Sequence, residues 1–258
     1  MFVMELIDTH AHLYLEDFSA DRQEVVDRAR EAGVSRVYLP NIDTGSMQDM
    51  SDLCQWDPEF FIPMMGLHPT SVDERFGEEL KAVEGWLAKR DFAAIGEIGI
   101  DLYWDKTYFG QQQEALKIQL GWAMEKGMPV VIHSRESFTE IFDVMEQVDD
   151  GRLYGIFHSF SGSLEDARRI LDMGFKIGIN GIVTFKNSSL DQIVREIDIG
   201  DLVLETDAPF LAPVPRRGKR NESAYVRYVA DKVAEVKQMP VEEVAAITTQ
   251  NALNIFMK

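Results

Sequence analysis

Short runs of apolar residues recur along the chain, and each run is followed by a longer amphipathic stretch. Eight such runs are expected to form strands, and they lie at residues 2–8, 34–40, 60–67, 92–101, 128–134, 152–159, 174–181 and 201–208. Because these runs are apolar almost throughout, rather than at alternate positions, they are typical of parallel strands buried on both faces. The pattern therefore predicts strands that alternate with helices along the chain.

The stretches between the runs have helical periodicity. Leu116, Leu120, Ala123 and Met124 form one apolar stripe, and Val226, Val229, Val233 and Val236 form another, with spacings of three, four and three residues. Ser19 is expected to cap the helix that carries Val25, because a serine hydroxyl can accept a hydrogen bond from a free N–H of the first turn. Pro240 is expected to be the first residue of the last helix.

Eight strand–helix units in 258 residues predict an α/β fold, a single (β/α)₈ TIM-type barrel that forms one domain over residues 1–258. A doubly wound open sheet is the competing architecture, but it usually has a glycine-rich phosphate-binding turn after its first strand. Here the corresponding residues, 7–13, read IDTHAHL. No linker rich in serine, glycine or proline divides the chain, so the barrel is the better interpretation.

Composition excludes several classes of protein. With 45% hydrophobic and 27% charged residues, the chain can bury a core and is not a wholly disordered protein. The single cysteine, Cys54, excludes an internal disulfide framework and a cysteine-rich zinc site. No apolar stretch reaches the roughly 20 residues of a membrane helix. A signal peptide would begin with a positively charged region, but no Lys or Arg precedes Arg22. We expect a soluble, cytoplasmic protein with no membrane association and no obligate protein partner.

All five histidines lie at the carboxyl ends of predicted strands: His10 and His12 after the first, His68 at the third, His133 at the fifth and His158 at the sixth. Glu97 and Asp207 occupy equivalent places on the fourth and eighth strands. In a barrel these ends converge on one mouth, where active sites are built. A single histidine there is more often a packed, hydrogen-bonded residue than a ligand, but five structural histidines have no reason to share one rim. The distribution therefore favours a metal site.

The chemistry of these residues agrees with their spacing. His10 and His12, two positions apart in an extended segment, point to the same side and can bind one ion. The six candidate ligands (His10, His12, Glu97, His133, His158 and Asp207) exceed one tetrahedral site, so a carboxylate that bridges two ions is the economical arrangement. Glu97, with Gly96 and Gly99 beside it, is the natural bridge. We expect two divalent metal ions, and the ligands leave zinc, magnesium, manganese and iron open.

Seven ordered segments resemble the TatD family of metal-dependent deoxyribonucleases. They are IDTHAHL, GLHP, IGEIGID, VIHSRES, FHSFSG, ETDAPFL and RRGKRNE, and the resemblance extends from about residue 7 to NALNIF near the carboxyl terminus. The family belongs to the metal-dependent hydrolase group, whose members have a TIM-barrel fold. Two positions depart from the family pattern: Ser159 stands where many members have cysteine, and Ser223 where many have proline.

The resemblance implies a role for each candidate residue. His10 and His12 would bind the first ion, His133 and His158 would bind the second, and Glu97 would bridge the two. Asp207 would contact a metal and the nucleophilic water, and His68 would lie by the substrate phosphate. The predicted catalytic residues are accordingly Asp207, Glu97 and His68.

Candidate phosphate-binding residues lie in the loop after the eighth strand. Four of the five residues in RRGKR, at 216–220, are basic, although the chain as a whole has a net charge of −18. A solvated surface loop is the simpler interpretation, but the loop follows Asp207, and arginine presents a bidentate fork to phosphate. Besides His68, the expected phosphate contacts are Arg135, Arg217, Lys219 and Arg220. Nearby aromatic residues, Tyr103, Trp104, Phe160, Phe185 and Phe210, could stack on bases or simply pack the loops.

These observations favour a metal-dependent nuclease. The resemblance implies hydrolysis of DNA phosphodiester bonds by a metal-activated water, as a 3′–5′ exonuclease on single strands or frayed ends. The net charge of −18 argues against coating of nucleic acid by the whole surface, so DNA should bind locally, at the barrel mouth. The main alternative is a metal-dependent hydrolase of a small-molecule ester or amide, or of misacylated tRNA. A non-catalytic protein that binds metals for stability is a second alternative.

Overall fold

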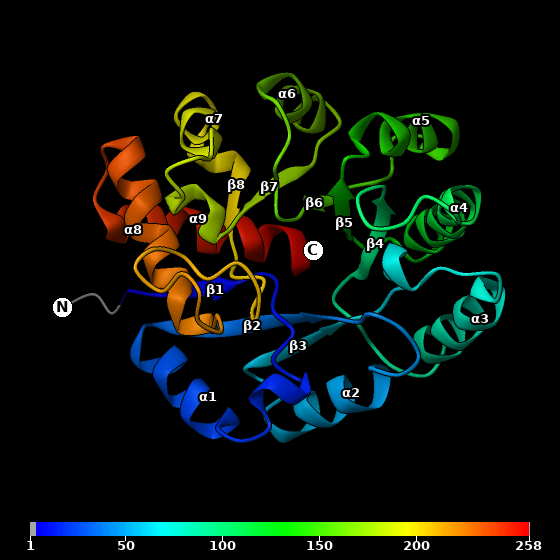
Figure 1. The fold of residues 1–258 in the computed structure, drawn as a ribbon, viewed down its shortest axis with the longest axis horizontal. Helices are drawn as coiled ribbons and strands as arrows, with labels where there is room; N and C mark the ends of the chain where they lie inside the picture. Colours follow the sequence, from blue (N-terminus) through cyan, green and yellow to red (C-terminus); the bar gives the residue numbers. More distant parts are fainter. Residues whose placement is uncertain (1–3, 258) are drawn as a thin grey trace.

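The computed structural model describes residues 4–257, and it folds into a ring of parallel strands surrounded by helices (Figure 1). The strands are β1 Leu6–Asp8, β2 Val34–Pro40, β3 Phe61–Met64, β4 Ile95–Asp101, β5 Val130–Arg135, β6 Gly155–Phe157, β7 Lys176–Ile179 and β8 Leu202–Leu204. Each lies within, or overlaps, a predicted run. Residues 2 and 3 of the first predicted run lie outside the described residues. The predicted (β/α)₈ barrel is confirmed.

Hydrogen bonds divide the strands into two parallel groups, β1-β2-β3 and β4-β5-β6-β7-β8. Two isolated bridges join the groups into a ring. Met65, just after β3, pairs with Ile95 of β4, and Ala11, after β1, pairs with Ala208, after β8. The backbone N–H of Thr9 also donates to the carbonyl of Leu204, at 3.1 Å. This closure places the first strand, β1, beside the last strand, β8.

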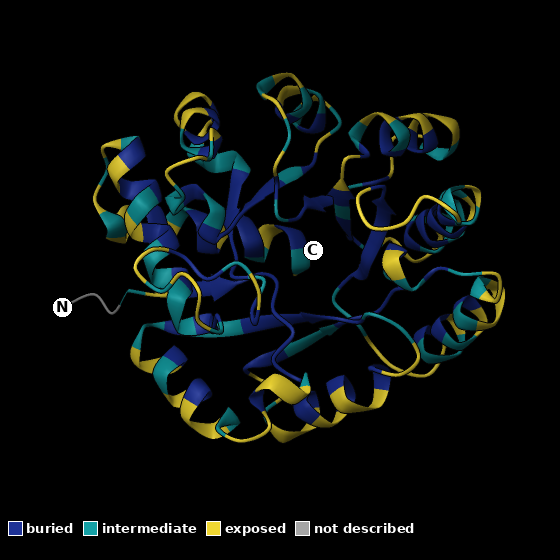
Figure 2. Cartoon of the chain, in the orientation of Figure 1, coloured by how far each residue is buried: buried dark blue, intermediate teal, exposed yellow. Residues whose placement is uncertain are grey.

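The helices, except the last, form an outer layer around the strands, with their outward faces exposed and the strands buried (Figure 2). They are α1 Arg22–Glu31, α2 Met47–Trp56, α3 Phe76–Leu87, α4 Phe109–Lys126, α5 Phe138–Val148, α6 Leu164–Asp172, α7 Leu190–Glu196, α8 Val226–Lys237 and α9 Val241–Phe256. Short 3₁₀ helices, at Glu16–Phe18, Pro69–Ser71, Gly181–Thr184, Ile199–Asp201 and Ser223–Tyr225, lie in the connections. No helix among residues 4–257 is long and apolar enough to cross a membrane.

The predicted helical stripes face the core. Leu116, Leu120 and Ala123 of α4 are buried, Met124 is half-buried, and the four valines of α8 are all buried. Two predictions about helix starts are wrong by short distances. Asp21, rather than Ser19, precedes the first residue of α1, because Ser19 ends the preceding 3₁₀ turn. Pro240 lies just before α9 rather than within it.

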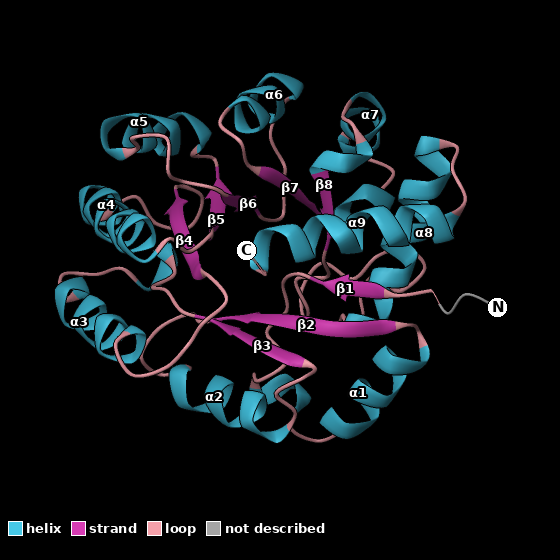
Figure 3. Ribbon diagram, turned by 180° about the vertical axis from the view of Figure 1, so that it is seen from behind, coloured by secondary structure: helices cyan, strands magenta, loops and turns pink. Residues whose placement is uncertain are grey.

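Helix α9 lies across one end of the barrel (Figure 3). The side-chain amide of Asn251 donates to the carbonyl of Leu202, the first residue of β8, at 2.7 Å. The Thr249 hydroxyl donates to the carbonyl of Glu5, just before β1, at 3.0 Å. Both contacts lie at the amino ends of strands, so the opposite mouth, at the carboxyl ends, is the one left for a site.

Candidate metal centre

The loops that follow β1 and β8 hold each other in place at the mouth. The backbone N–H of Asp207 donates to the carbonyl of His10 at 2.8 Å, and that of His12 donates to the carbonyl of Ala208 at 2.7 Å. These bonds are the local consequence of barrel closure. They place two histidines and an aspartate, almost 200 residues apart in sequence, on one side of the cavity.

Glu97, in the middle of β4, lies at the centre of the histidines and is only 2% exposed. Its Oε2 atom is 3.1 Å from Nε2 of His10 and 3.8 Å from Nε2 of His12. Its Oε1 atom is 2.8 Å from Nδ1 of His133 and 3.1 Å from Nε2 of His158. Each carboxylate oxygen therefore faces a different pair of histidines, as the predicted bridging role requires.

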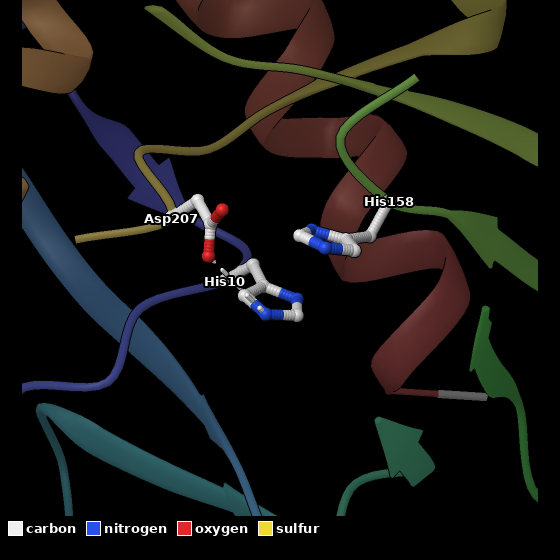
Figure 4. A group of neighbouring side chains, drawn as sticks. All are labelled: His10, His158 and Asp207. Atoms are coloured by element: carbon white, nitrogen blue, oxygen red, sulfur yellow. Dashed lines mark ion pairs between the residues drawn. The ribbon is translucent and has the colours of Figure 1, made fainter. Parts of the chain in front are cut away.

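Three groups of side chains present ligand atoms within 4.8 Å of one another. They are His10, His12 and Glu97; His68, Glu97 and His133; and His10, His158 and Asp207. In the third group the rings of His10 and His158 stack at 3.6 Å, and Oδ1 of Asp207 lies 3.9 Å from Nε2 of His10 (Figure 4). All six predicted metal ligands thus lie in one cluster, together with His68.

The tautomer of His12 is set by Tyr14. The Tyr14 hydroxyl donates to the carbonyl of Pro40 at 2.6 Å, so its oxygen is left to accept from Nδ1–H of His12, at 2.9 Å. The unprotonated Nε2 atom of His12 then faces Glu97 and lies 3.3 Å from Nε2 of His10. Such outer hydrogen bonds are typical of histidines that bind metal ions.

Asp101, at the end of β4, orients His133. Nε2–H of His133 donates to Oδ2 of Asp101 at 2.9 Å, which leaves Nδ1 unprotonated and directed at Glu97. The other carboxylate oxygen of Asp101 accepts from the backbone N–H groups of Tyr103 and Trp104. The one carboxylate of Asp101 therefore holds the start of the loop after β4 and orients a histidine of the centre.

Glu205 is a buried residue that the sequence analysis missed. Its Oε1 atom lies 3.3 Å from Nδ1 of His158 and accepts a short hydrogen bond from the backbone N–H of Ser159. Gly178 makes room for it, because a Cβ there would overlap the Glu205 carboxylate. The spacing of Glu205 and Asp207, two residues apart in ETD, was a usable signal, since alternate residues of an extended segment share a face.

His68 presents a donor rather than a free lone pair to the cavity. Its Nδ1 atom accepts from the backbone N–H of Thr70 at 3.1 Å, so a neutral ring carries its proton on Nε2. Nε2 lies 3.3 Å from Oε1 of Glu97. The donor is suited to an oxygen of an anionic substrate, as expected for the position beside the phosphate, whereas metal binding needs an unprotonated nitrogen.

Burial and mutual repulsion keep two of the imidazoles neutral. Burial, with the charge of His158, lowers the pKa of His10 well below its usual value, and burial lowers the pKa of His12 to about 4. Burial would raise the pKa of Glu97, but the surrounding histidines outweigh it and hold that pKa well below its usual range. Burial also raises the pKa of Asp207 to about 7. Neutral His10 and His12 beside an ionised Glu97 have the protonation states that bind a divalent cation. Burial is outweighed at the other two histidines, where Asp101 and Glu97 raise the pKa of His133, and Glu97 and Glu205 raise that of His158.

The donor set therefore fits metal ions. Two ring nitrogens 3.3 Å apart face one carboxylate oxygen, and the Nδ1 atom of His10 is buried with no hydrogen-bond partner among the described residues. All members of the cluster except the fully buried His10 line an open cavity of about 720 Å³. Structural metal sites are usually closed by their protein ligands, whereas an open cavity leaves room for water and substrate.

Arg135 stands at the rim of this cavity. Its guanidinium lies over the rings of Tyr103 and Trp104, with 3.9 and 5.2 Å to the ring centres. Both rings are at least half exposed. The cation and the two aromatic faces thus lie at the opening, within reach of a ligand that enters it.

The four cations of the RRGKR loop have different surroundings. Arg216 lies over the ring of Tyr225, and Arg217 lies over the ring of Phe185. Lys219 is exposed. Arg220 makes two hydrogen bonds to the carboxylate of Asp21, at 2.8 and 2.7 Å. This ion pair joins the loop to the start of α1, so Arg220 supports the scaffold instead of reaching the cavity as expected.

Histidines and carboxylates clustered at the carboxyl ends of the strands of a (β/α)₈ barrel are the arrangement expected of a metal-dependent hydrolase. The comparisons with known proteins agree. A metal-dependent hydrolase named YabD from Bacillus subtilis (strain 168) is 37% identical over 97% of this chain and 98% of its own length. YcfH, a metal-dependent hydrolase of Escherichia coli (strain K12), is 32% identical over 98% of this chain and 96% of its own.

Solved structures and a family model also match this chain. The crystal structure of YjjV, a TatD homologue from Escherichia coli K12, matches with a TM-score of 0.89 and 30% identity, and covers 100% of both chains. An uncharacterized amidohydrolase of Saccharomyces cerevisiae, at 19% identity and a TM-score of 0.83, shares the fold. The family model described as TatD related DNase matches residues 7–257. The chain belongs to this family.

Proposed function

We propose that the protein hydrolyses phosphodiester bonds of DNA at the barrel mouth, as a 3′–5′ exonuclease on single strands or frayed ends. The observation that carries the proposal is the position of Glu97, which directs one carboxylate oxygen at each of two histidine pairs. Two adjacent cations are the arrangement used for in-line displacement at phosphorus. Membership of the family described as TatD related DNase supports the choice of DNA.

Two ions would share Glu97. His10 and His12 would complete the first set of ligands, and His133 and His158 the second. When bound, the ions would supply positive charge opposite the phosphate and lower the pKa of the attacking water. Zinc, magnesium, manganese and iron all remain compatible with these ligands.

Three side chains of the cavity act on the substrate and the water. Asp207, beside His10, orients the water and accepts its proton at a carboxylate oxygen. His68 donates Nε2–H to a phosphate oxygen, because its Nδ1 atom is already committed to Thr70. Arg135 contributes a bidentate guanidinium from the rim.

The test is a panel of substrates incubated with metal-loaded protein. Single- and double-stranded DNA, RNA, and misacylated tRNA are supplied with Mg²⁺ or Mn²⁺, each DNA strand labelled at its 3′ or 5′ end. We expect loss of nucleotides from the 3′ end of single-stranded DNA, and no activity for Glu97→Ala. Cleavage of the tRNA ester alone, or no DNA cleavage above the Glu97→Ala control, would favour hydrolysis of an ester or small molecule instead.

A further inference from the structure

A second cavity adjoins the metal cavity on the side of β7 and α7. It has a volume of about 490 Å³ and shares two wall residues, Ser161 and Ile182, with the cavity of the metal centre. A volume of this size is in the range of small-ligand sites. None of the six predicted metal ligands lines it. A ligand too large for the metal cavity can therefore extend past Ser161 and Ile182 into this second cavity, here called the side cavity.

The walls of the side cavity combine apolar and polar groups. Ile182 and Phe185 are half-buried and form an apolar surface, while Asn187, Ser188 and Ser189 supply side-chain oxygen and nitrogen atoms. Such a mixture suits a sugar and base of any sequence, because it offers contact area with few fixed hydrogen bonds.

Arg217 is the single Lys or Arg among the residues that line the side cavity. Its guanidinium lies 3.9 Å from the centre of the Phe185 ring, and the side chain is exposed. The stacked ring restrains the guanidinium plane but leaves its N–H groups at the edge, where they can form paired hydrogen bonds to phosphate. Arg216 and Arg220 of the same loop are turned to Tyr225 and Asp21 instead.

The opposite side of the mouth has the reverse charge. A third cavity, of about 330 Å³, shares Thr70, Asp101 and Trp104 with the metal cavity. Five carboxylates line it, from Asp43, Asp73, Glu79, Asp101 and Asp105, and no Lys or Arg among residues 4–257 does so. A polyanion that leaves the metal centre would be repelled on that side and attracted on the side of Arg217.

We propose that the side cavity is a second nucleotide subsite, in which Arg217 pairs with the phosphate one position upstream of the scissile bond. The inference rests on the proposed function, since it assumes a nucleic acid strand in the metal cavity. It adds the direction of that strand: the 3′-terminal nucleotide lies at the metal centre and the 5′ portion passes Ser161 and Ile182 to Phe185 and Arg217.

The test compares a substrate that spans both cavities with one that fills only the metal cavity. Steady-state kinetics are measured on a single-stranded octathymidylate and on bis(4-nitrophenyl) phosphate, with metal-loaded wild type and Arg217→Ala. Arg217→Ala removes a charge-assisted pair of hydrogen bonds to the octanucleotide but not to the small diester. Relative to the wild type, the fold-increase in KM should therefore be at least about ten times larger for the octanucleotide than for the small diester. Arg217→Lys, which keeps the charge but not the fork, should recover part of the loss.

Arg168→Ala is the matched control, because Arg168 is an exposed arginine of the neighbouring α6 and lies outside both cavities. An equal rise in KM for this control would assign the effect to net charge and overturn the subsite. Unchanged octanucleotide kinetics in Arg217→Ala would overturn the subsite and leave the proposed function standing. A wild type that hydrolyses the small diester but not the octanucleotide would overturn both.

Discussion

Individual hydrogen bonds decide which ring nitrogen each histidine turns toward the centre. Tyr14 fixes the tautomer of His12, Asp101 that of His133, and the backbone of Thr70 that of His68. The first two leave a lone pair directed at Glu97, and the third leaves a proton. Histidines that look equivalent in the sequence are therefore divided into ligands and a donor by their outer partners.

Substitution of Asp101 by asparagine should weaken metal binding. Asparagine has one side-chain oxygen for two tasks, and if that oxygen keeps the backbone N–H groups of Tyr103 and Trp104, its NH₂ group faces His133. His133 would then accept at Nε2 and carry its proton on Nδ1, the atom needed for the ion. We expect a 10- to 100-fold loss of affinity for Mn²⁺, measured by calorimetric titration.

Asp105→Asn provides the control, because Asp105 is exposed in the loop that follows Asp101 and has no contact with a histidine ring. It should bind Mn²⁺ like the wild type. If Asp101→Asn also bound Mn²⁺ with wild-type affinity, the orientation of His133 by Asp101 would be refuted.

Most candidate ligands could be predicted from the sequence because they stand at or just after the end of an apolar run. Glu97 is the exception, since it lies inside the run at 92–101 and in the middle of β4, not at its carboxyl end as expected. The outer partners of the ligands could not be predicted, since hydrogen bonding depends on the approach of distant segments. Tyr14, in the loop after β1, donates to the carbonyl of Pro40 at the end of β2. Glu205, after β8, contacts His158, after β6, although β7 lies between the two strands. Arg220 was similarly misplaced, because a run of cations does not reveal which of them meets Asp21.

At the level of elements, β4 is shaped by its glycines. Gly99 has a φ of 151°, and its missing side chain leaves space for the carbonyl of His133 on β5. A Cβ at this position would overlap that carbonyl oxygen. The close approach of the two strands is what brings Glu97 and His133 to 2.8 Å.

Gly99→Ala should therefore destabilise the fold by at least about 2 kcal/mol, because it combines a strained backbone with a steric overlap. The free energy of unfolding in urea gives the value. Gly121→Ala is the matched control: Gly121 lies inside α4 with open space around it, so alanine should stabilise by up to about 1 kcal/mol. A neutral Gly99→Ala variant would contradict the account of β4.

The loop after β8 is joined to α1 through charge. A hydrogen bond from Arg220 is the main cause that lowers the pKa of Asp21 below its usual 3.8, and burial only partly opposes it. The unfolded chain takes up this proton near pH 3.8, whereas the folded chain does so at lower pH. The ion pair therefore stabilises the fold above pH 3.8, and this contribution is lost as the pH falls through the folded value.

Asp21→Asn should reproduce that loss at every pH. The partners are about one-third exposed, so the cost at neutral pH should stay below about 1 kcal/mol. Urea unfolding of both proteins should give a constant difference between about pH 5 and 7, and a shrinking one below about pH 4. A difference that grew on acidification would contradict the sign of the Asp21 shift.

For the whole molecule, the alternation of apolar runs and helical stripes was enough to predict the barrel. It overestimated strand lengths: the run at 152–159 contains a strand of only three residues, Gly155–Phe157. The backbone N–H of His158 still donates to the carbonyl of Ile132 in β5, but strand pairing ends at Ser159, which has a φ of 48° and whose N–H donates to Glu205. Closure by isolated bridges, Ala11 with Ala208 and Met65 with Ile95, has no signal in the apolar pattern.

The acidic residues behind the net charge of −18 are unevenly distributed over the molecule. Some of them surround the third cavity, and others lie among the histidines, where metal ions would offset their charge. Arg135 lines the metal cavity, and Arg217 lines the side cavity. An acidic protein can thus present a local surface for phosphate, and binding should be confined to a short segment.

In the proposed centre, Glu97 joins two metal sites. Calorimetric titration of metal-free protein with Mn²⁺ tests this bridging role without any assumption about the substrate. We expect two ions per chain for the wild type and loss of at least one for Glu97→Ala, because each site loses a carboxylate oxygen. A single ion bound by the wild type, or two retained by a folded Glu97→Ala variant, would contradict it.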